Sequence, residues 1–289
     1  MKQPKSNHKR LFLFAGYDAQ NCVHDALVYY VRTLAALGDV VVYMDCDCPK
    51  HEINKLKPYT ITTIAQRHGE YDFGSYKRAY IYARDNMDLS EYEFIYLVND
   101  SVFGPMVDIM PTLVRMEQSA CDACSIVVST HQTHAYMESW FVRINQKIAL
   151  SPWFDKFMTS ITSQPTKAQI TIKYEHGLSK LINTHGCTWT GLVRYRGRKT
   201  YNSPLALFRA GCPFVKKASF VRHYGAAGAQ VNAILTQCAP GARDAVVKSA
   251  NKIYGTAYMD WFLTSNPIKI GIRNIKYLLY KIFGNGGAK

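Results

Sequence analysis

One stretch decides the fold of this chain: Tyr92-Glu93-Phe94-Ile95-Tyr96-Leu97-Val98-Asn99-Asp100-Ser101-Val102-Phe103-Gly104-Pro105. An apolar, β-prone run of this length between turn residues indicates a strand buried on both faces, as in a parallel sheet. Ligands of open α/β sheets lie beyond the carboxyl ends of the strands, so Asn99, Asp100 and Ser101 are predicted to lie at a ligand site. An acid there can hold a divalent cation or a sugar hydroxyl. The strand alone also allows a second interpretation, in which Asp100 only caps the turn.

The composition describes an ordinary globular chain. Its 289 residues can bury a sizeable core as one large domain or two small ones, and the hydrophobic and charged fractions are 48% and 19%. The first ten residues are basic, but the apolar run 11–15 is too short for a signal peptide, and no stretch approaches the roughly 20 apolar residues of a spanning helix. The cytoplasm is therefore the predicted location. The eight cysteines show neither a zinc-ribbon nor a disulfide spacing.

The positive charge is concentrated in the second part of the chain. Residues 176–289 hold 17 Lys and Arg against only Asp244 and Asp260, a net charge of +15, which leaves −1 for residues 1–175 out of the total of +14. Such a field attracts nucleic acid, an anionic membrane or a phosphorylated substrate.

Strand and helix patterns alternate in the first half, which predicts a parallel sheet with right-handed crossovers. Strands are predicted at 11–15, 39–44, 59–65, 92–98, 124–129 and 139–144, and helices at 22–37, 79–87, 108–118, 151–158, 170–183, 203–210 and 267–283.

Acids follow the first two strands, at Asp18 and Asp45, and the loop after the third strand runs from Arg67 to Arg78. Its two glycines let the backbone approach a ligand, and its basic side chains suit phosphates at a helix start. The alternative is a solvated loop with Tyr71 and Phe73 packed into the core.

Two further groups have both a functional and a structural interpretation. His131 and His134 lack the spacing of a helical zinc pair, so we expect loop residues that line a polar cleft. Glu175 lies near the start of a predicted helix and can be aimed at the carboxyl edge of the sheet, or it can pair in solvent with Lys173 or Lys180.

The basic segments of the second part lead to the same kind of choice. The run 194–199 is a solvated face or a receptor for a pyrophosphate or lipid phosphate. In 267–283, Lys269, Arg273 and Lys276 are predicted to share one helix face among isoleucines and leucines. This pattern is typical of an interfacial helix on anionic lipid, and equally of a terminal helix packed on its own domain.

Three segments taken together resemble the rhamnan synthesis protein F family of bacterial polysaccharide glycosyltransferases. They are Tyr71-Asp72-Phe73-Gly74-Ser75-Tyr76-Lys77, the segment from Leu97 to Pro105, and Lys173-Tyr174-Glu175-His176-Gly177-Leu178-Ser179. Supporting similarity lies in 138–141, 151–154 and 203–216. The resemblance covers roughly residues 10–220 and leaves the tail unaccounted for.

The resemblance implies an α/β fold with a GT-A-like nucleotide-binding sheet, mostly parallel, and a helical basic C-terminal part. The implied division is a glycosyltransferase domain at 1–220 and a basic helical extension at 221–289, packed on that domain or on the membrane. Such enzymes commonly hold a divalent cation, Mn²⁺ or Mg²⁺, through Asp-x-Asp. Here Asn99-Asp100-Ser101 stands in that place. One carboxylate is a poorer cation site than two, so a metal at Asp100 and neutralisation of the phosphates by basic residues both stay open.

The resemblance also implies roles for individual residues. Glu175 matches the carboxylate that removes the acceptor proton in inverting enzymes, although His176 stands where an Asp is usual. The expected donor-binding residues are Asp18, Asp45, Arg67, Tyr71, Asp72, Lys77, Asn99, Asp100 and Ser101.

The expected reaction is transfer of rhamnose or another hexose from a nucleotide sugar to a growing lipid-linked surface polysaccharide, O-antigen or capsule. The enzyme would be peripheral on the inner face of the bacterial plasma membrane, with 267–283 on anionic lipid and no nucleic acid as partner. A non-catalytic basic α/β module for nucleic acid or membrane is the alternative. A Rossmann oxidoreductase is excluded because Ala15-Gly16-Tyr17-Asp18 lacks the G-x-G-x-x-G pattern.

Overall fold

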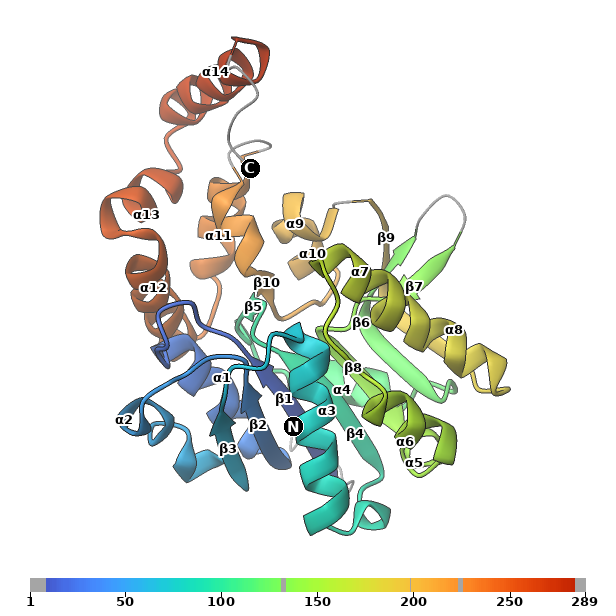
Figure 1. Ribbon diagram of the computed structural model, residues 1–289. Coiled ribbons are helices and arrows are strands. Elements are labelled where there is room, and N and C mark those ends of the chain that lie inside the picture. Colours follow the sequence, from blue (N-terminus) through green and yellow to red (C-terminus); the bar gives the residue numbers. More distant parts are fainter. Residues whose placement is uncertain (1–8, 131–133, 198, 223–225, 284–289) are drawn as a thin grey trace, which may run out of the picture. The chain divides into compact units, whose positions relative to one another are not determined.

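The computed structural model describes residues 9–130, 134–197, 199–222 and 226–283 (Figure 1). They form two compact units. The first unit comprises the described residues of 1–100 and 109–196, and the second those of 101–108 and 197–289. The predicted domain boundary between residues 220 and 221 therefore lies inside the second unit.

The first unit is built on an eight-stranded mixed sheet with the order β3-β2-β1-β4-β8-β6-β7 and β9 paired to β6. β1 to β4 are mutually parallel where they pair, and β8 runs antiparallel between β4 and β6. This topology confirms the predicted α/β fold with a GT-A-like sheet. Its strands are β1 (Arg10–Gly16), β2 (Asp39–Met44), β3 (Thr62–Ala65), β4 (Phe94–Asn99), β6 (Ala123–Thr130), β7 (Ala135–Met137), β8 (Phe141–Asn145) and β9 (Trp189–Arg196).

The parallel strands end at one edge of the sheet. Every residue of β1 and β4 is buried, as the continuous apolar runs predict. In the register, Ala15 lies opposite Asn99, and Gly16 opposite Met44. The residues that follow β1, β2 and β4 consequently leave the sheet side by side, which places the predicted acids at a common edge.

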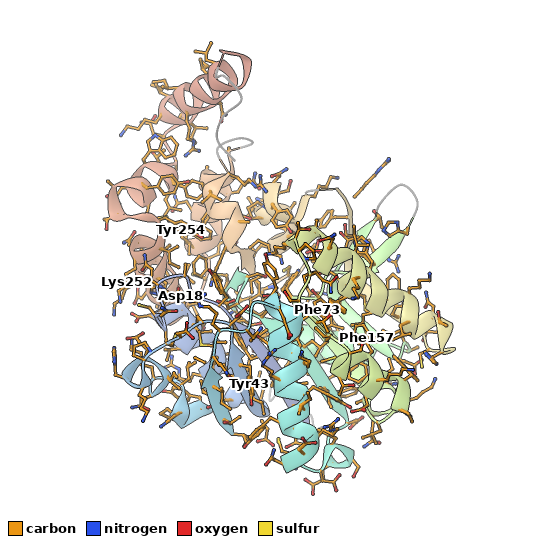
Figure 2. All side chains as sticks on the ribbon, in the orientation of Figure 1. Asp18, Tyr43, Phe73, Phe157, Lys252 and Tyr254 are labelled. Atoms are coloured by element: carbon orange, nitrogen blue, oxygen red, sulfur yellow. The ribbon has the colours of Figure 1, made fainter. Side chains whose placement is uncertain are left out.

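Helices cover both faces of this sheet (Figure 1). Tyr30 of α1 packs edge-on against Phe14. On the opposite face of the sheet, Phe73 of α3 contacts Phe157 of α6, and Figure 2 labels these two side chains. The helical elements of the first unit are α1 (Asp25–Ala35), α2 (Lys50–Ile53), η1 (Lys57–Tyr59), α3 (Tyr71–Asn86), η2 (Leu89–Glu91), α4 (Met110–Glu117), α5 (Gln146–Ala149), α6 (Pro152–Thr159), α7 (Lys167–Ile170), η3 (Thr171–His176) and α8 (Gly177–Thr184).

Two predicted boundaries after β2 are wrong. The strand predicted at 59–65 begins three residues later in the structure, at Thr62. The preceding residues Lys57–Tyr59 form a 3-10 turn instead, because the φ of Pro58 is fixed and its nitrogen has no N–H to donate to a neighbouring strand. The predicted loop 67–78 is helical from Tyr71 onward. Phe73, Tyr76 and Tyr80 are buried at helical spacing, and this packing outweighs the low helix propensity of Gly74.

Two further elements depart from the prediction. The helix predicted at 170–183 begins at Lys167 and contains a π-helical turn, Thr171–His176. β9 has no counterpart among the predicted strands, since its segment 189–196 alternates little between apolar and polar residues and only Val193 is buried. The strand exists because it pairs in parallel with β6, a contact between residues more than 60 positions apart.

The second unit is largely helical, as predicted for the C-terminal part, but it begins before residue 221 and also includes residues 101–108. The short strands β5 (Val102–Phe103) and β10 (Val215–Lys216) pair in antiparallel fashion. The rings of Phe103, Tyr254 and Phe262 all pack against Phe220. Its helices are α9 (Lys199–Asn202), α10 (Pro204–Arg209), η4 (Lys217–Val221), α11 (Ala227–Leu235), α12 (Pro240–Tyr254), α13 (Thr256–Phe262) and α14 (Pro267–Phe283). Within the described residues, no helix combines the length and the hydropathy that crossing a bilayer requires.

The predicted basic face of α14 is wrong in one residue. Arg273 is only 3% exposed and donates to the carbonyl oxygens of Trp261 and Phe262, so it packs into its own unit and does not share an outer face with Lys269. A guanidinium can be buried in this way because the last carbonyls of a helix lack intrahelical partners.

A buried ion pair fixes the start of β1 and yields a stability prediction. Arg10 binds Glu117 through two nitrogens, at 2.5 and 2.8 Å, with both side chains 3% exposed. Arg10→Met leaves the Glu117 carboxylate buried without its cation, so we expect a loss of about 3–5 kcal/mol in unfolding free energy, measured by urea denaturation.

The neighbouring residue is the matched control. Lys9 pairs with Glu91 at the surface, where both side chains are about half exposed. Lys9→Met should change the unfolding free energy little, because solvent screens such pairs. Equal losses in the two variants would contradict the assignment of Arg10 as a buried anchor.

Candidate active site

Asp45, at the end of β2, holds the loop that follows β3. Its side chain is buried, and its Oδ1 accepts hydrogen bonds from the backbone N–H groups of His68 at 2.7 Å and Gly69 at 2.9 Å. Two bonds from the backbone to one carboxylate are charge-assisted and therefore strong. Asp45 thus joins the ends of β2 and β3 at the carboxyl edge of the sheet.

Asp18, in the turn after β1, organises that turn in the same way. Its carboxylate accepts from the N–H groups of Gln20 and Cys22 and lies 3.1 Å from His24 Nε2. Burial acts to raise the pKa of Asp18, but the His24 and Cys22 bonds outweigh it and hold the pKa below its ordinary value. Asp18 is therefore a charged carboxylate in this turn.

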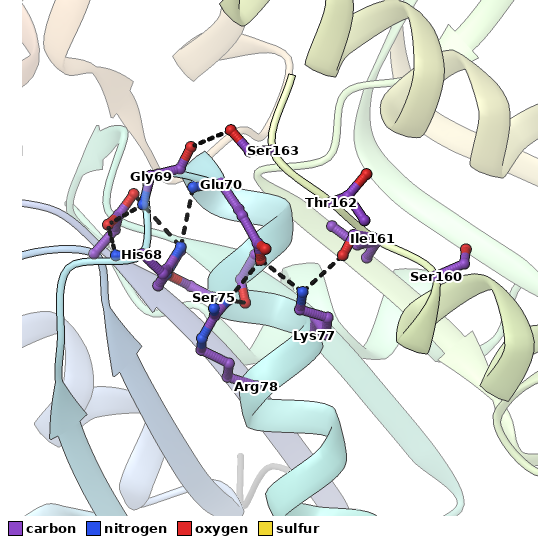
Figure 3. A network of polar contacts seen from close by, with 12 residues as sticks. His68, Gly69, Glu70, Ser75, Lys77, Arg78, Ser160, Ile161, Thr162 and Ser163 are labelled. Atoms are coloured by element: carbon purple, nitrogen blue, oxygen red, sulfur yellow. Dashed lines mark hydrogen bonds and ion pairs between the residues drawn. The ribbon is translucent and has the colours of Figure 1, made fainter. Parts of the chain in front are cut away.

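His68 locks the loop onto the first turns of α3 (Figure 3). Its Nδ1 accepts from the N–H of Glu70 at 3.1 Å, and its Nε2 lies 3.0 Å from Ser75 Oγ. An Nδ1 that accepts requires the neutral tautomer protonated on Nε2. A Cβ at position 74 would lie 2.8 Å from the His68 ring, so Gly74 is needed for this close approach.

The buried imidazole leads to a pH prediction. Burial, followed by the Arg78 charge, lowers the pKa of His68 to about 4, whereas the unfolded chain has a value near 6.5. Between these two pH values the His68 side chain is therefore protonated in the unfolded state and neutral in the folded state. Unfolding free energy should fall by up to about 3 kcal/mol as the pH drops from about 6.5 to about 4. Urea denaturation across this range measures it.

A matched pair of variants tests the assignment to His68. His68→Gln should flatten the pH dependence, whereas His51→Gln should preserve it, because the His51 side chain is 77% exposed. An NMR titration in which the His68 ring protonates near pH 6.5 would contradict the prediction.

Asn99, the last residue of β4, joins the strand tip to α3. Its Nδ2 donates to Asp72 Oδ2 at 3.0 Å, and its backbone N–H donates to the Trp140 carbonyl at 3.1 Å. One turn along α3, the fully buried Tyr76 hydroxyl donates to the Ser139 carbonyl at 2.9 Å. The tip of β4, the start of α3 and the segment before β8 are thus tied together by hydrogen bonds.

Glu175 reaches this cluster from the π-helical turn η3. Its Oε1 accepts from both the backbone N–H and the hydroxyl of Ser139, each at 2.7 Å. Burial, then Asp72, Tyr30 and Glu175, raise the pKa of Tyr76, so the charges of Asp72 and Glu175 both act on one phenol. π-Helical turns are rare and frequently mark functional sites.

β7 and the preceding His134 contact the helix that carries Glu175. The Tyr136 ring lies 3.8 Å from the His176 ring, and His134 Nε2 is 3.2 Å from His176 Nδ1. One turn further, the N–H of Met137 donates to Ser179 Oγ at 3.0 Å. These contacts hold the helix directly after Glu175, at His176 and Ser179, against β7 and His134.

Asp100 lies on the other side of the strand tip. It is 8% exposed, and its N–H donates to the Ala15 carbonyl at 3.1 Å. Burial raises the pKa of Cys46, and the carboxylates of Asp18 and Asp100 both add to that rise. Asp100 is therefore associated with the ends of β1 and β2, while Asn99 next to it is associated with Asp72 and the Glu175 cluster.

The sequence profile of the family described as rhamnan synthesis protein F matches residues 40–271 of this chain. The chain belongs to the rhamnan synthesis protein F family. This membership confirms the resemblance seen in the motifs, and the family indicates a glycosyltransferase that uses a nucleotide sugar. The match also extends well beyond residue 220, to which the motifs reached.

Two solved structures are similar to this family member. One, described as a nucleotide-diphospho-sugar transferase from Desulfovibrio desulfuricans G20, has 15% identity and a TM-score of 0.37 over 79% of this chain and 97% of that chain. The other, the glycosyltransferase GlyE of Streptococcus pneumoniae TIGR4, has 11% identity and a TM-score of 0.39 over 94% of this chain and 64% of that chain. No curated protein sequence matches the chain.

Three predicted donor-binding residues of this family member have protein partners, acidic for Arg67 and Lys77 and basic for Ser101. Arg67 pairs with Asp47 at 2.9 Å on the surface. Lys77 lies 2.7 Å from Glu70 and donates to the Ile161 carbonyl (Figure 3). Ser101 belongs to the second unit, where Lys216 Nζ donates to its hydroxyl at 3.2 Å.

Tyr71 begins α3 in a left-handed conformation with φ 56° and a side chain 40% exposed, whereas Phe73 is buried. Of the predicted alternative, a solvated loop with both rings in the core, only the burial of Phe73 is found, because the segment is helical from Tyr71 onward. A tyrosine at positive φ is strained, and such residues cluster at functional sites.

Tyr76, Ser139 and His68 have no role in the prediction from the sequence, although the first two stand inside motifs of the family resemblance. The signal that could have found Ser139 is its place between Glu138 and Trp140 in such a motif. His131 of the predicted histidine pair lies outside the described residues. Among the residues that are described, no three His, Cys, Asp or Glu side chains are arranged to hold a metal ion.

Proposed function

We propose that this protein is an inverting glycosyltransferase that moves a hexosyl group, rhamnose or another hexose, from a nucleotide sugar to a lipid-linked surface polysaccharide such as O-antigen or capsule. The observation that carries the proposal is the cluster in which Asn99 binds Asp72 and Ser139 binds Glu175, at the carboxyl edge of the parallel strands. Family membership supplies the reaction class.

Glu175 is the proposed catalytic base. Its carboxylate takes the proton of the acceptor hydroxyl as that oxygen attacks the anomeric carbon from the face opposite the nucleotide. The bond between this carbon and the diphosphate oxygen breaks, and the nucleoside diphosphate leaves with the electron pair. Two hydrogen bonds from Ser139 aim the carboxylate before the acceptor arrives.

The donor is proposed to lie over the ends of β1, β2 and β4. Asp18 and Asp45 stand nearest the nucleoside, and Asp72, held by Asn99, accepts a sugar hydroxyl. The departing diphosphate develops negative charge, which needs a positive partner. Because Arg67 and Lys77 already have acidic partners, we propose that a divalent cation, Mn²⁺ or Mg²⁺, would be held by Asp100 and would offset the charge of the departing diphosphate.

A nucleotide-sugar screen tests the proposal directly. The purified protein is incubated with hexose donors that differ in nucleotide, with and without Mn²⁺, and release of the nucleoside diphosphate and thermal stabilisation by it are measured. We expect one donor class to be hydrolysed slowly in the absence of acceptor, and the matching diphosphate to raise the melting temperature. A protein that neither binds nor cleaves any donor would instead be a non-catalytic basic module.

A further inference from the structure

The helix α14 has two faces with different partners. On one face, Arg273 donates to the Phe262 carbonyl at 2.9 Å and its guanidinium lies 5.2 Å from the Trp261 ring. A Cβ at Gly228 would come within 1.8 Å of the Phe262 oxygen and 3.2 Å of Arg273, so α11, α13 and α14 meet closely here. This face belongs to the core of the second unit.

The other face is an exposed apolar stripe. Ile268, Ile272, Ile275 and Leu279 are 71%, 50%, 59% and 49% exposed, the largest such group on one described helix. At about 100° per residue they fall within an arc of roughly 60°. Contiguous apolar side chains facing water mark a surface that another body covers.

The charge around the stripe indicates what covers it. Residues 267–283 hold four basic residues and no acidic one, and residues 197–289 hold 14 Lys and Arg against 2 Asp. A second copy of this unit would bring like charge to like charge, and a nucleic acid would leave the isoleucines in water. A body that is both anionic and apolar at its surface satisfies both features, and a lipid bilayer with anionic headgroups is such a body.

We propose that α14 lies in the plane of an anionic bilayer with Ile268, Ile272, Ile275 and Leu279 inserted among the acyl chains. Lys269 borders the stripe and binds lipid phosphate. Arg273 keeps the opposite face of the helix attached to the second unit. The sequence pattern left open whether this helix packs on its own domain or on lipid, and the two faces allow both at once. The inference does not depend on the transfer reaction.

Flotation of the full chain with vesicles tests the proposal, using phosphatidylcholine alone or mixed with phosphatidylglycerol. We expect binding to the anionic vesicles that weakens at high salt. Ile275→Glu should lower the vesicle partition coefficient about tenfold or more, because an isoleucine inserted among the acyl chains is lost. Lys269→Gln should lower it about fivefold, because one contact with lipid phosphate is lost. Ile61→Glu is the matched control, because Ile61 is 51% exposed on the first unit, and it should bind as the wild type does.

Thermal unfolding of each variant and light scattering of the free protein complete the design. Because the changed side chains are exposed, their melting temperatures should stay close to that of the wild type. Equal binding by Ile275→Glu and the wild type would overturn the proposal, as would equal affinity for neutral and anionic vesicles. A dimer that Ile275→Glu dissociates, without vesicle binding by the wild type, would assign the stripe to a second copy instead.

Discussion

Glu175→Gln should lower the rate of sugar transfer by about 10²–10⁴, the contribution expected of a positioned general base. The amide has the same shape and can still accept the Ser139 hydrogen bonds, but it cannot take the acceptor proton. Binding of the nucleoside diphosphate should be unchanged, since the proposed donor site uses other residues, at the ends of β1, β2 and β4. Initial transfer rates together with calorimetric titration of the diphosphate measure the two effects separately.

A neighbouring carboxylate serves as the matched control for this variant. Glu138 accepts from the indole N–H of Trp140 at 2.9 Å, a bond that an amide oxygen can keep. Glu138→Gln should therefore change transfer by no more than a few-fold. Normal transfer by Glu175→Gln would remove Glu175 as the base, and a large loss in Glu138→Gln alone would move that role to Glu138.

The second large effect is expected for Asp100→Asn, which should lower transfer by at least about a hundredfold while the protein stays folded. Loss of an outer partner of a metal site already costs about 10–100-fold, and a direct ligand should cost no less. Asn keeps one neutral oxygen, so excess Mn²⁺ should restore part of the rate. Transfer is measured across Mn²⁺ concentrations, and folding by thermal denaturation.

The wild type and a distant variant distinguish a metal ligand from a structural acid. Asp85→Asn removes an exposed carboxylate paired with Arg84 and should leave transfer and its Mn²⁺ dependence unchanged. If chelation of divalent cations leaves wild-type transfer intact, the metal role of Asp100 is wrong. Loss of folding in Asp100→Asn would instead support the turn-capping interpretation of this residue.

The sheet was predictable because its strands carry their own signal. β1, β2 and β4 are short apolar runs between turn residues, and a run buried on both faces needs no partner sequence to be identified. The acids after these strands were assigned to one edge by the rule for parallel sheets, and the register of Ala15 with Asn99 agrees with it. β9 had no such signal, since pairing with β6 creates it.

The candidate site was predictable only as a set of residue types. Asp72, Asn99 and Glu175 were identified from motifs, but the bonds that join them pass through Ser139 and the carbonyl of Trp140, about 40 positions from Asn99. The basic residues illustrate the limit. The sequence predicts Lys77 and Arg67 as phosphate ligands. In the structure Lys77 pairs with Glu70 and Arg67 with Asp47, and neither pair has the i, i+3 or i, i+4 spacing by which an ion pair is predicted from sequence.

By itself the sequence determined the α/β class, the parallel strands with acids at their tips, the family and the uneven charge. These features depend on residues close together in the chain, where hydrophobic period and turn chemistry act directly. Tertiary structure alone decided that a π-helical turn and β7 hold Glu175 against Ser139, and that α14 buries Arg273 while exposing its isoleucines. Both outcomes depend on which distant elements pack together, and a local pattern carries no information about its partner.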